Sequence, residues 1–210
     1  CEGLVGSEMC IRDRCIKISK IGFMFAPNHH SAMRHVGPVR QKLGVRTIFN
    51  ILGPLSNPAN VKKQLIGVFD KKWLIPMAET LKNLGSTRAM IVNGSDGLDE
   101  ITSTGKSYVA ELKNNHVYSY EISPLDYDIE IADATSLVGG DPSHNAKKII
   151  SLLDGEKGSF RDIVLLNSAA ALYVDDKVSD IKKGIELSKQ SIDNGQAKSA
   201  LNKLIKVSNS

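Results

Sequence analysis

Three carboxylates lie within five residues in the run Asp96-Gly97-Leu98-Asp99-Glu100, directly after an expected strand. Ligands of open α/β sheets bind beyond the carboxyl ends of strands, and carboxylates there suit Mg²⁺, a hard cation that also bridges to substrate phosphates. The adjacent charges of Asp99 and Glu100 repel each other unless a cation lies near them. A solvated acidic turn with an aspartate cap explains the same residues, and spacing alone favours that simpler alternative.

A second candidate site lies in residues 25–58, which contain paired histidines, three arginines, two Gly-Pro pairs and an Asn-Pro exit. If residues 31–43 form a helix, His30 and Arg40 fall within about 80° of each other around its axis. A guanidinium binds a carboxylate or phosphate through two parallel hydrogen bonds. A surface arginine and a structural histidine are the simpler alternatives. Two neighbouring arginines could also provide the guanidinium: Arg34 and Arg46.

The rest of the sequence offers few other candidates for a site. Gly139-Gly140-Asp141 could form a phosphate nest, but the entrance of a helix, with Asp141 as N-cap, explains these residues better. The sequence contains no G-x-x-x-x-G-K-[ST] run, no G-x-G-x-x-G run and no Gly-x-Ser-x-Gly elbow. No cysteine follows residue 15, so covalent catalysis has no obvious agent.

The composition is that of an ordinary soluble globular protein, with 41% hydrophobic and 24% charged residues among 210. A net charge of +4 from scattered Lys and Arg, with only 5% aromatic residues, gives least support to a nucleic-acid groove. No apolar run of about 18 residues exists, so we expect no membrane span. The chain start has no secretory signal pattern.

The amino-terminal residues differ in character from the rest of the chain. All three cysteines, Cys1, Cys10 and Cys15, lie there, and the chain begins with Cys rather than Met. Residues 1–15 show neither helix nor strand period, so we expect them to be non-native, either a segment added during cloning or an artefact at the 5′ end of an incomplete gene. Cys10 and Cys15 lack companion histidines at zinc-ligand spacing. The cysteine-free remainder is typical of a reduced cytoplasmic protein.

Apolar periodicity predicts an α/β fold with a mostly parallel sheet flanked by helices. Residues 64–69 and 88–93 read as strands around an amphipathic helix at 72–84, the pattern of a parallel unit. Residues 107–112 and 116–122 read as a hairpin. We expect residues 16–25 to be buried and a short helix at 46–52 to end at Gly53-Pro54. Four more helices are expected: 142–153, 160–174, 179–193 and 196–207.

Long motifs in the sequence resemble a known family. The run HHSAMRHVGPVRQKLGVRTIFNILGPLSNPAN, then NGSDGLDEIT, GGDP and DIVLLNSAAALYV, closely resemble the anthranilate phosphoribosyltransferases, over about residues 16–205. The resemblance implies a homodimer of the nucleoside phosphorylase/phosphoribosyltransferase type, with its active site between a small helical and a large α/β domain. Residues 16–28 would then link into the α/β domain, 29–57 would complete the helical domain, and 60–207 would form the α/β domain.

The resemblance also implies an activity and its site residues. Members transfer the phosphoribosyl group of PRPP to the amine of anthranilate and release diphosphate, the second step from chorismate to tryptophan. Arg40 matches the arginine that contacts the anthranilate carboxylate, and His30 and Pro54 match residues that line the anthranilate channel. Asp99 and Glu100 match the carboxylates that hold Mg²⁺ on the diphosphate of PRPP. Asp96 fits less firmly, as a supporting residue.

The sequence departs from the family pattern in two respects. Ser31 stands where many members have proline, and the Gly-Thr-Gly-Gly-Asp, Asn-x-Ser-Thr and Lys-His-Gly-Asn motifs that cradle PRPP are not in this sequence. We expect them before Ile16, so that the chain is an incomplete form of the enzyme. We therefore expect the isolated chain to be inactive, with apolar faces exposed.

Two other functions stay open at this point. One is a related pyrimidine nucleoside phosphorylase, which would need a phosphate site in place of the PRPP cradle. The other is a non-catalytic, nucleic-acid-binding member of the same fold. The scattered basic charge and the retained Asp99-Glu100 pair argue against the second alternative.

Overall fold

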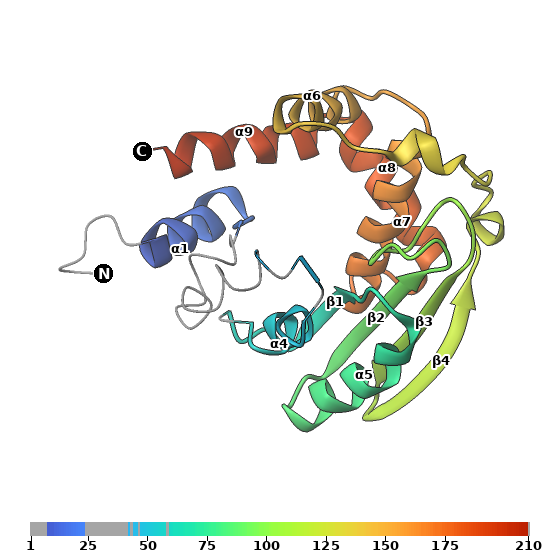
Figure 1. The fold of residues 1–210 in the computed structure, drawn as a ribbon. Helices are drawn as coiled ribbons and strands as arrows, with labels where there is room; N and C mark the ends of the chain where they lie inside the picture. The colour runs from blue at the N-terminus through green and yellow to red at the C-terminus, as the bar shows by residue number, and fades with distance from the viewer. Residues whose placement is uncertain (1–7, 24–41, 43, 46, 58, 210) are drawn as a thin grey trace.

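The described residues form a four-stranded sheet, drawn at the lower right of Figure 1. This computed structural model describes residues 8–23, 42, 44–45, 47–57 and 59–209. The strands lie in the order in which they occur along the chain: β1 (Lys63–Gly67), β2 (Arg88–Gly94), β3 (Ser107–Lys113) and β4 (His116–Ile122). The α/β fold with helices flanking a sheet is therefore confirmed.

The strand directions differ from the expectation. β1 and β2 are parallel, but β2 pairs antiparallel with β3 and β3 pairs antiparallel with β4. The expectation of a mostly parallel sheet is therefore wrong for these four strands. Only β1 and β2 are joined through a helix, whereas the connections from β2 to β3 and from β3 to β4 contain no helix and lead to antiparallel neighbours. In the β3–β4 turn, Asn114 and Asn115 have φ of 51° and 61°, the left-handed backbone that tight hairpins require.

Helices cover both faces of the sheet, with α5 on one face and α7 with α8 on the other (Figure 1). Within the described residues, the helices that sequence periodicity predicts are all present. The α-helices are α1 (Glu8–Ser19), α4 (Phe49–Leu55), α5 (Leu74–Asn83), α6 (Pro142–Leu153), α7 (Ser159–Val174), α8 (Ile181–Asp193) and α9 (Gln196–Ser208). Three 3-10 turns are η1 (Lys71–Trp73), η2 (Pro124–Tyr127) and η3 (Ala134–Leu137).

Side chains alternate between two apolar cores along β2, which is buried over its whole length. Met90 and Val92 pack into the core that α7 and α8 close. Ala89 and Ile91 point to the opposite face and pack into the core that α5 closes. A two-residue period with both partners apolar is the pattern of a strand covered on both sides. β2 is thus held firmly, and the loop that leaves its end starts from a fixed point.

The amino-terminal segment contains a helix that its sequence pattern does not indicate. α1 lies beside α9 at the other end of the chain (Figure 1), and the Arg14 guanidinium donates to the Val207 carbonyl at 3.1 Å. Cys15 and Ser19, one helical turn apart, are buried. Ile16 is 46% exposed and Phe23 is 76% exposed, so the predicted burial of residues 16–25 is wrong for its described part. The non-native origin of residues 1–15 stays a prediction.

α4 corrects the expected end of the short helix near residue 50. Pro54 lies inside α4 rather than after it, and the N–H of Ser56, just beyond the helix, donates to the carbonyls of Leu52 and Gly53. Ile51 is buried in the same core as α5. A proline in the last turn of so short a helix removes only the one donor that would reach back a turn, so the helix continues past it. The division into domains at residues 57–60 stays a prediction.

α7 and α8 approach each other closely in the larger core. A Cβ atom built on Gly184 of α8 would lie 2.8 Å from the Cα of Ala169 in α7, closer than real contacts allow. Glycine therefore permits the two helices to touch through their backbones. Within the described residues, the helices are too short or too polar for any of them to cross a bilayer.

This close approach leads to a stability prediction. Replacing Gly184 by alanine should lower the free energy of unfolding by about 1–3 kcal/mol, because the added methyl group overpacks the α7–α8 contact. Gly53 in α4 is a matched control, since nothing lies within 4 Å of a Cβ built there. Gly53→Ala should change that free energy by less than about 0.5 kcal/mol, because the gain in helix propensity is offset by the crowding of a Cβ atom that precedes Pro54. Urea unfolding of both variants measures the difference; equal effects would contradict the proposed contact.

Candidate functional site

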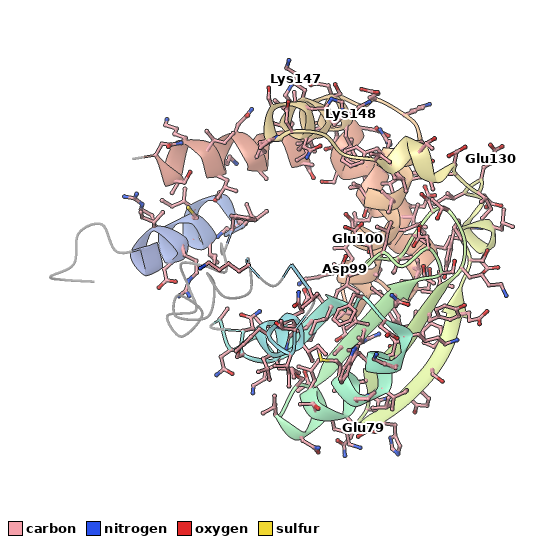
Figure 2. The ribbon with its side chains drawn as sticks, viewed as in Figure 1. Glu79, Asp99, Glu100, Glu130, Lys147 and Lys148 are labelled. Atoms are coloured by element: carbon pink, nitrogen blue, oxygen red, sulfur yellow. The ribbon has the colours of Figure 1, made fainter. Side chains whose placement is uncertain are left out.

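Asp99 and Glu100 lie in the loop that leaves the carboxyl end of β2. Figure 2 shows the two residues side by side near one end of the sheet. Because β1 and β2 are parallel, the carboxyl ends of both strands meet at this edge. Both residues are exposed to solvent. The loop therefore presents two neighbouring carboxylates where α/β sheets bind ligands.

Asp96 has a different role from the other two carboxylates, because its oxygens bind the loop itself. The hydroxyls of Thr102 and Thr104 both donate to its Oδ2 at 2.5 Å, and the Leu98 N–H donates to its Oδ1 at 3.0 Å. Burial alone would raise the pKa of Asp96, but the hydrogen bonds from Thr102 and Thr104 outweigh it, and the pKa is lowered. Asp96 therefore closes the loop as an ionised acceptor.

β1 supports the loop at Asp99. A Cβ atom built on Gly67, the last residue of β1, would lie 1.6 Å from the carbonyl oxygen of Asp99. The contact involves backbone atoms on both sides, so no side-chain rotation could make room for a methyl group. Only glycine at this position lets the loop lie directly against the end of β1.

Asn93 joins the ends of β1 and β2 to the same loop. Its side chain is buried, and its Nδ2 donates to the Val68 carbonyl at 2.8 Å and to the Leu98 carbonyl at 3.4 Å. The Gly94 N–H donates to the same Leu98 carbonyl at 2.8 Å. These bonds satisfy the backbone at the point where the sheet ladder stops.

α7 supports the loop immediately after Glu100. The side-chain amide of Asn167 makes a pair of hydrogen bonds with Ile101: its Oδ1 accepts from the Ile101 N–H at 3.0 Å, and its Nδ2 donates to the Ile101 carbonyl at 2.8 Å. The same Nδ2 donates to the Ile163 carbonyl within α7 at 2.9 Å. The loop is thus fixed at Asp99 by a strand and at Ile101 by a helix.

The local charges favour a cation near the pair. Burial raises the pKa of Glu100, and the negative charges of Asp99 and Asp96 raise it further. A bound cation would remove this repulsion, and carboxylate oxygen is the donor that Mg²⁺ prefers. Across the described ranges, no three His, Cys, Asp or Glu side chains converge as metal ligands, so Asp96 does not complete a three-carboxylate set. Asp99 and Glu100 fit a cation that takes its other oxygens from a substrate and from water.

The other predicted site residues are only partly described. His30 and Arg40 lie outside the described residues, as do Arg34 and Arg46. Pro54 lies in α4, half-buried. Asp141 accepts from the His144 N–H at 2.8 Å at the start of α6, which confirms the helix-entrance interpretation of the double-glycine run.

The residues that shape the loop were not among the predicted candidates: Gly67, Asn93, Thr102, Thr104 and Asn167. Their contacts join segments up to 66 positions apart, which one sequence does not pair. Only two features of the sequence could have indicated these residues. Asn167 is a polar amide within the apolar run IVLLNSAAALYV, and the threonines follow the acidic turn at the spacing of a local side-chain turn.

Comparison with known proteins gives close relatives. The chain is 53% identical over 197 residues to an anthranilate phosphoribosyltransferase of Bradyrhizobium sp. (strain ORS 278), covering 94% of this chain and 58% of the relative. It is 55% identical over 195 residues to the anthranilate phosphoribosyltransferase of Rhodopseudomonas palustris (strain TIE-1), covering 93% and 58%. The chain thus spans a little more than half the length of these relatives.

Solved structures agree with the sequence relatives. The anthranilate phosphoribosyltransferase of Thermus thermophilus matches with a TM-score of 0.87 at 38% identity, over 95% of this chain and 59% of that one. The Saccharomyces cerevisiae enzyme in complex with PRPP and Mg matches with a TM-score of 0.81 at 27% identity, over 90% of this chain and 54% of that one. The resemblance to anthranilate phosphoribosyltransferases is therefore confirmed.

A family-level match covers most of the chain. The sequence pattern of the glycosyl transferase family, a/b domain, matches residues 8–198 and so includes α1, the sheet and the acidic loop. The chain therefore belongs to the glycosyl transferase family with an a/b domain.

Proposed function

We propose that the protein transfers the phosphoribosyl group of PRPP to anthranilate and releases diphosphate. The observation that carries the proposal is the loop after β2, which fixes its own backbone through Asp96 and leaves Asp99 and Glu100 exposed. The motif that contains the loop, NGSDGLDEIT, lies in a chain 53–55% identical to proteins named for this reaction. By the same resemblance we propose a homodimer in the cytoplasm.

The reaction asks for positioning more than for a strong base. A bond forms between the amine nitrogen of anthranilate and the anomeric carbon of PRPP, the bond from that carbon to diphosphate breaks, and the amine gives up a proton to water. The amine is already nucleophilic, so the site need only orient the reactants and hold the cation that offsets the charge of the leaving diphosphate.

Asp99 and Glu100 would hold Mg²⁺ on the diphosphate of PRPP. The ion, when bound, offsets the negative charge that builds on the leaving group. A Saccharomyces cerevisiae relative has been solved with PRPP and Mg, which supports this assignment. Arg40 would pair with the carboxylate of anthranilate, and His30 and the Gly53-Pro54 segment would line the acceptor site.

The first test is the reaction itself in the full-length protein. Anthranilate fluorescence should fall only when both PRPP and Mg²⁺ are present, and diphosphate should appear in equal amount. No loss of anthranilate, together with phosphate-dependent cleavage of a pyrimidine nucleoside, would support the phosphorylase alternative instead.

The metal assignment predicts a change in Mg²⁺ dependence. Asp99→Asn combined with Glu100→Gln should raise the Mg²⁺ concentration for half-maximal activity more than about 100-fold, since even outer-shell changes typically cost about 10- to 100-fold. Glu79→Gln combined with Glu130→Gln is the charge-matched control, since Figure 2 shows both residues well away from the pair. Identical Mg²⁺ titrations for both variants would contradict the assignment.

Asp96 should affect stability rather than bind the metal. Asp96→Asn should lower the free energy of unfolding by about 1 kcal/mol, because an amide oxygen replaces a charged acceptor of the two threonine hydroxyls.

The stabilisation by Asp96 should depend on pH. The pKa of Asp96 is lowered in the folded state, so its stabilisation is present above the usual value of 3.8 and is lost as pH falls through the folded pKa. The difference between wild type and variant, followed by urea unfolding, should therefore shrink below pH 3.8.

A control for Asp96 is available elsewhere in the chain. The Asp133 carboxylate accepts from the N–H and hydroxyl of Thr135 at the start of η3. Asp133→Asn replaces a carboxylate that accepts from a threonine in the same way, but it should leave the amide signals of residues 97–101 unchanged in an NMR spectrum. Unchanged signals there for Asp96→Asn as well would show that Asp96 does not shape the loop.

Arg40 should determine the affinity for anthranilate. Arg40→Ala in the full-length protein should raise the KM for anthranilate about 10- to 100-fold, the loss expected for hydrogen bonds to a charged group. The KM for PRPP should stay unchanged. Arg46→Ala serves as the control; a larger effect from Arg46→Ala would assign the acceptor role to that arginine instead.

A further inference from the structure

We propose that Asn167 is a positioning residue for the cation site formed by Asp99 and Glu100. The inference rests on the proposed function, because it assigns the support of the same site. The Asn167 amide binds both backbone groups of Ile101, the residue directly after Glu100. Those two hydrogen bonds fix the peptide groups on both sides of Ile101, and hence the direction in which the backbone of Glu100 leaves the loop.

Asn167 is itself held in one orientation. Its Nδ2 donates to the Ile163 carbonyl one turn earlier in α7, so the amide cannot rotate without losing a second bond. The adjoining residues of α7 belong to the core: Leu165, Leu166, Ala169 and Ala170 are buried. The loop is therefore tied to one of the most firmly packed helices of the described structure rather than to another loop.

Asp99, on the other side of Glu100 from Ile101, is held by a van der Waals contact rather than by a side-chain hydrogen bond. Gly67 at the end of β1 lies against the carbonyl of Asp99 with no room for a methyl group. Asp99 is thus limited by β1, and Ile101 by α7. With its two neighbours fixed, Glu100 has little backbone freedom. The carboxylates of Asp99 and Glu100 are therefore positioned by the backbone rather than by hydrogen bonds of their own oxygens.

This arrangement should increase the affinity for a cation. A flexible pair of adjacent carboxylates must lose conformational entropy to converge on one ion, whereas a preorganised pair has lost that freedom on folding. Partners that orient metal ligands typically change affinity about 10- to 100-fold when they are removed. Asn167 would be such a partner, acting through the backbone of Ile101.

The experiment titrates the full-length protein, with PRPP present, with Mn²⁺, a paramagnetic substitute for Mg²⁺, and follows the broadening of its amide NMR signals. In the wild type, broadening should begin at residues 97–101. Asn167→Leu, which keeps the branched shape of the side chain, and Asn167→Ala, which favours the helix, should each raise the Mn²⁺ concentration for half-broadening about tenfold. Two variants are used in case one of them does not fold, and the amide signals of β2 show whether each variant is folded.

Val164→Ala is the control for a general loss of stability. Val164 lies on α7 and packs on the same core but makes none of the loop hydrogen bonds, so its titration should stay within about twofold of wild type. Half-broadening at the wild-type concentration in both Asn167 variants would overturn the positioning role while leaving the cation site intact. Absence of broadening at residues 97–101 in the wild type would instead overturn the cation site, and the inference with it.

Discussion

The loop after β2 must keep two like charges side by side in solvent while its own backbone stays fixed. A carboxylate that accepts several hydrogen bonds from its own loop has fewer lone pairs left for a cation. The three carboxylates have separate roles in the loop: Asp96 accepts hydrogen bonds from Thr102 and Thr104, while Asp99 and Glu100 are exposed to solvent. The remaining support comes from β1 and α7, so the site depends on the packing of the whole sheet.

The two apolar cores explain why that support is firm. β2 is buried on both faces, and α7 and α8 touch through Gly184 and Ala169. An amide placed on α7 and a glycine placed at the end of β1 therefore have fixed positions relative to the loop. Chemistry that relies on orientation, such as displacement of diphosphate by an amine, needs this kind of rigid frame more than it needs an unusual side chain.

Local patterns in the sequence predicted much of the fold, including the β3–β4 hairpin, the N-cap at Asp141 and the apolar helix α7. Helix α1 was missed because its charged and apolar residues are mixed without a helical period, and its buried face, with Cys15 and Ser19, packs beside α9 near the other end of the chain. Residue types and spacing favoured a solvated acidic turn at this loop, and the resemblance to the family supplied the cation role of Asp99 and Glu100; neither showed that Asp96 accepts from Thr102 and Thr104. Asn167 and Gly67 act through contacts between distant segments, which neither periodicity nor composition records.

The central claim is that Asp99 and Glu100 bind the cation while Asp96 holds the loop. The most direct measurement is the anomalous scattering of Mn²⁺ in crystals of the full-length protein grown with PRPP. The account predicts a single peak about 2.1 Å from carboxylate oxygens of Asp99 and Glu100, with the Asp96 carboxylate still hydrogen-bonded to Thr102 and Thr104. A peak on Asp96, or none at residues 96–100 while PRPP is bound, would contradict it.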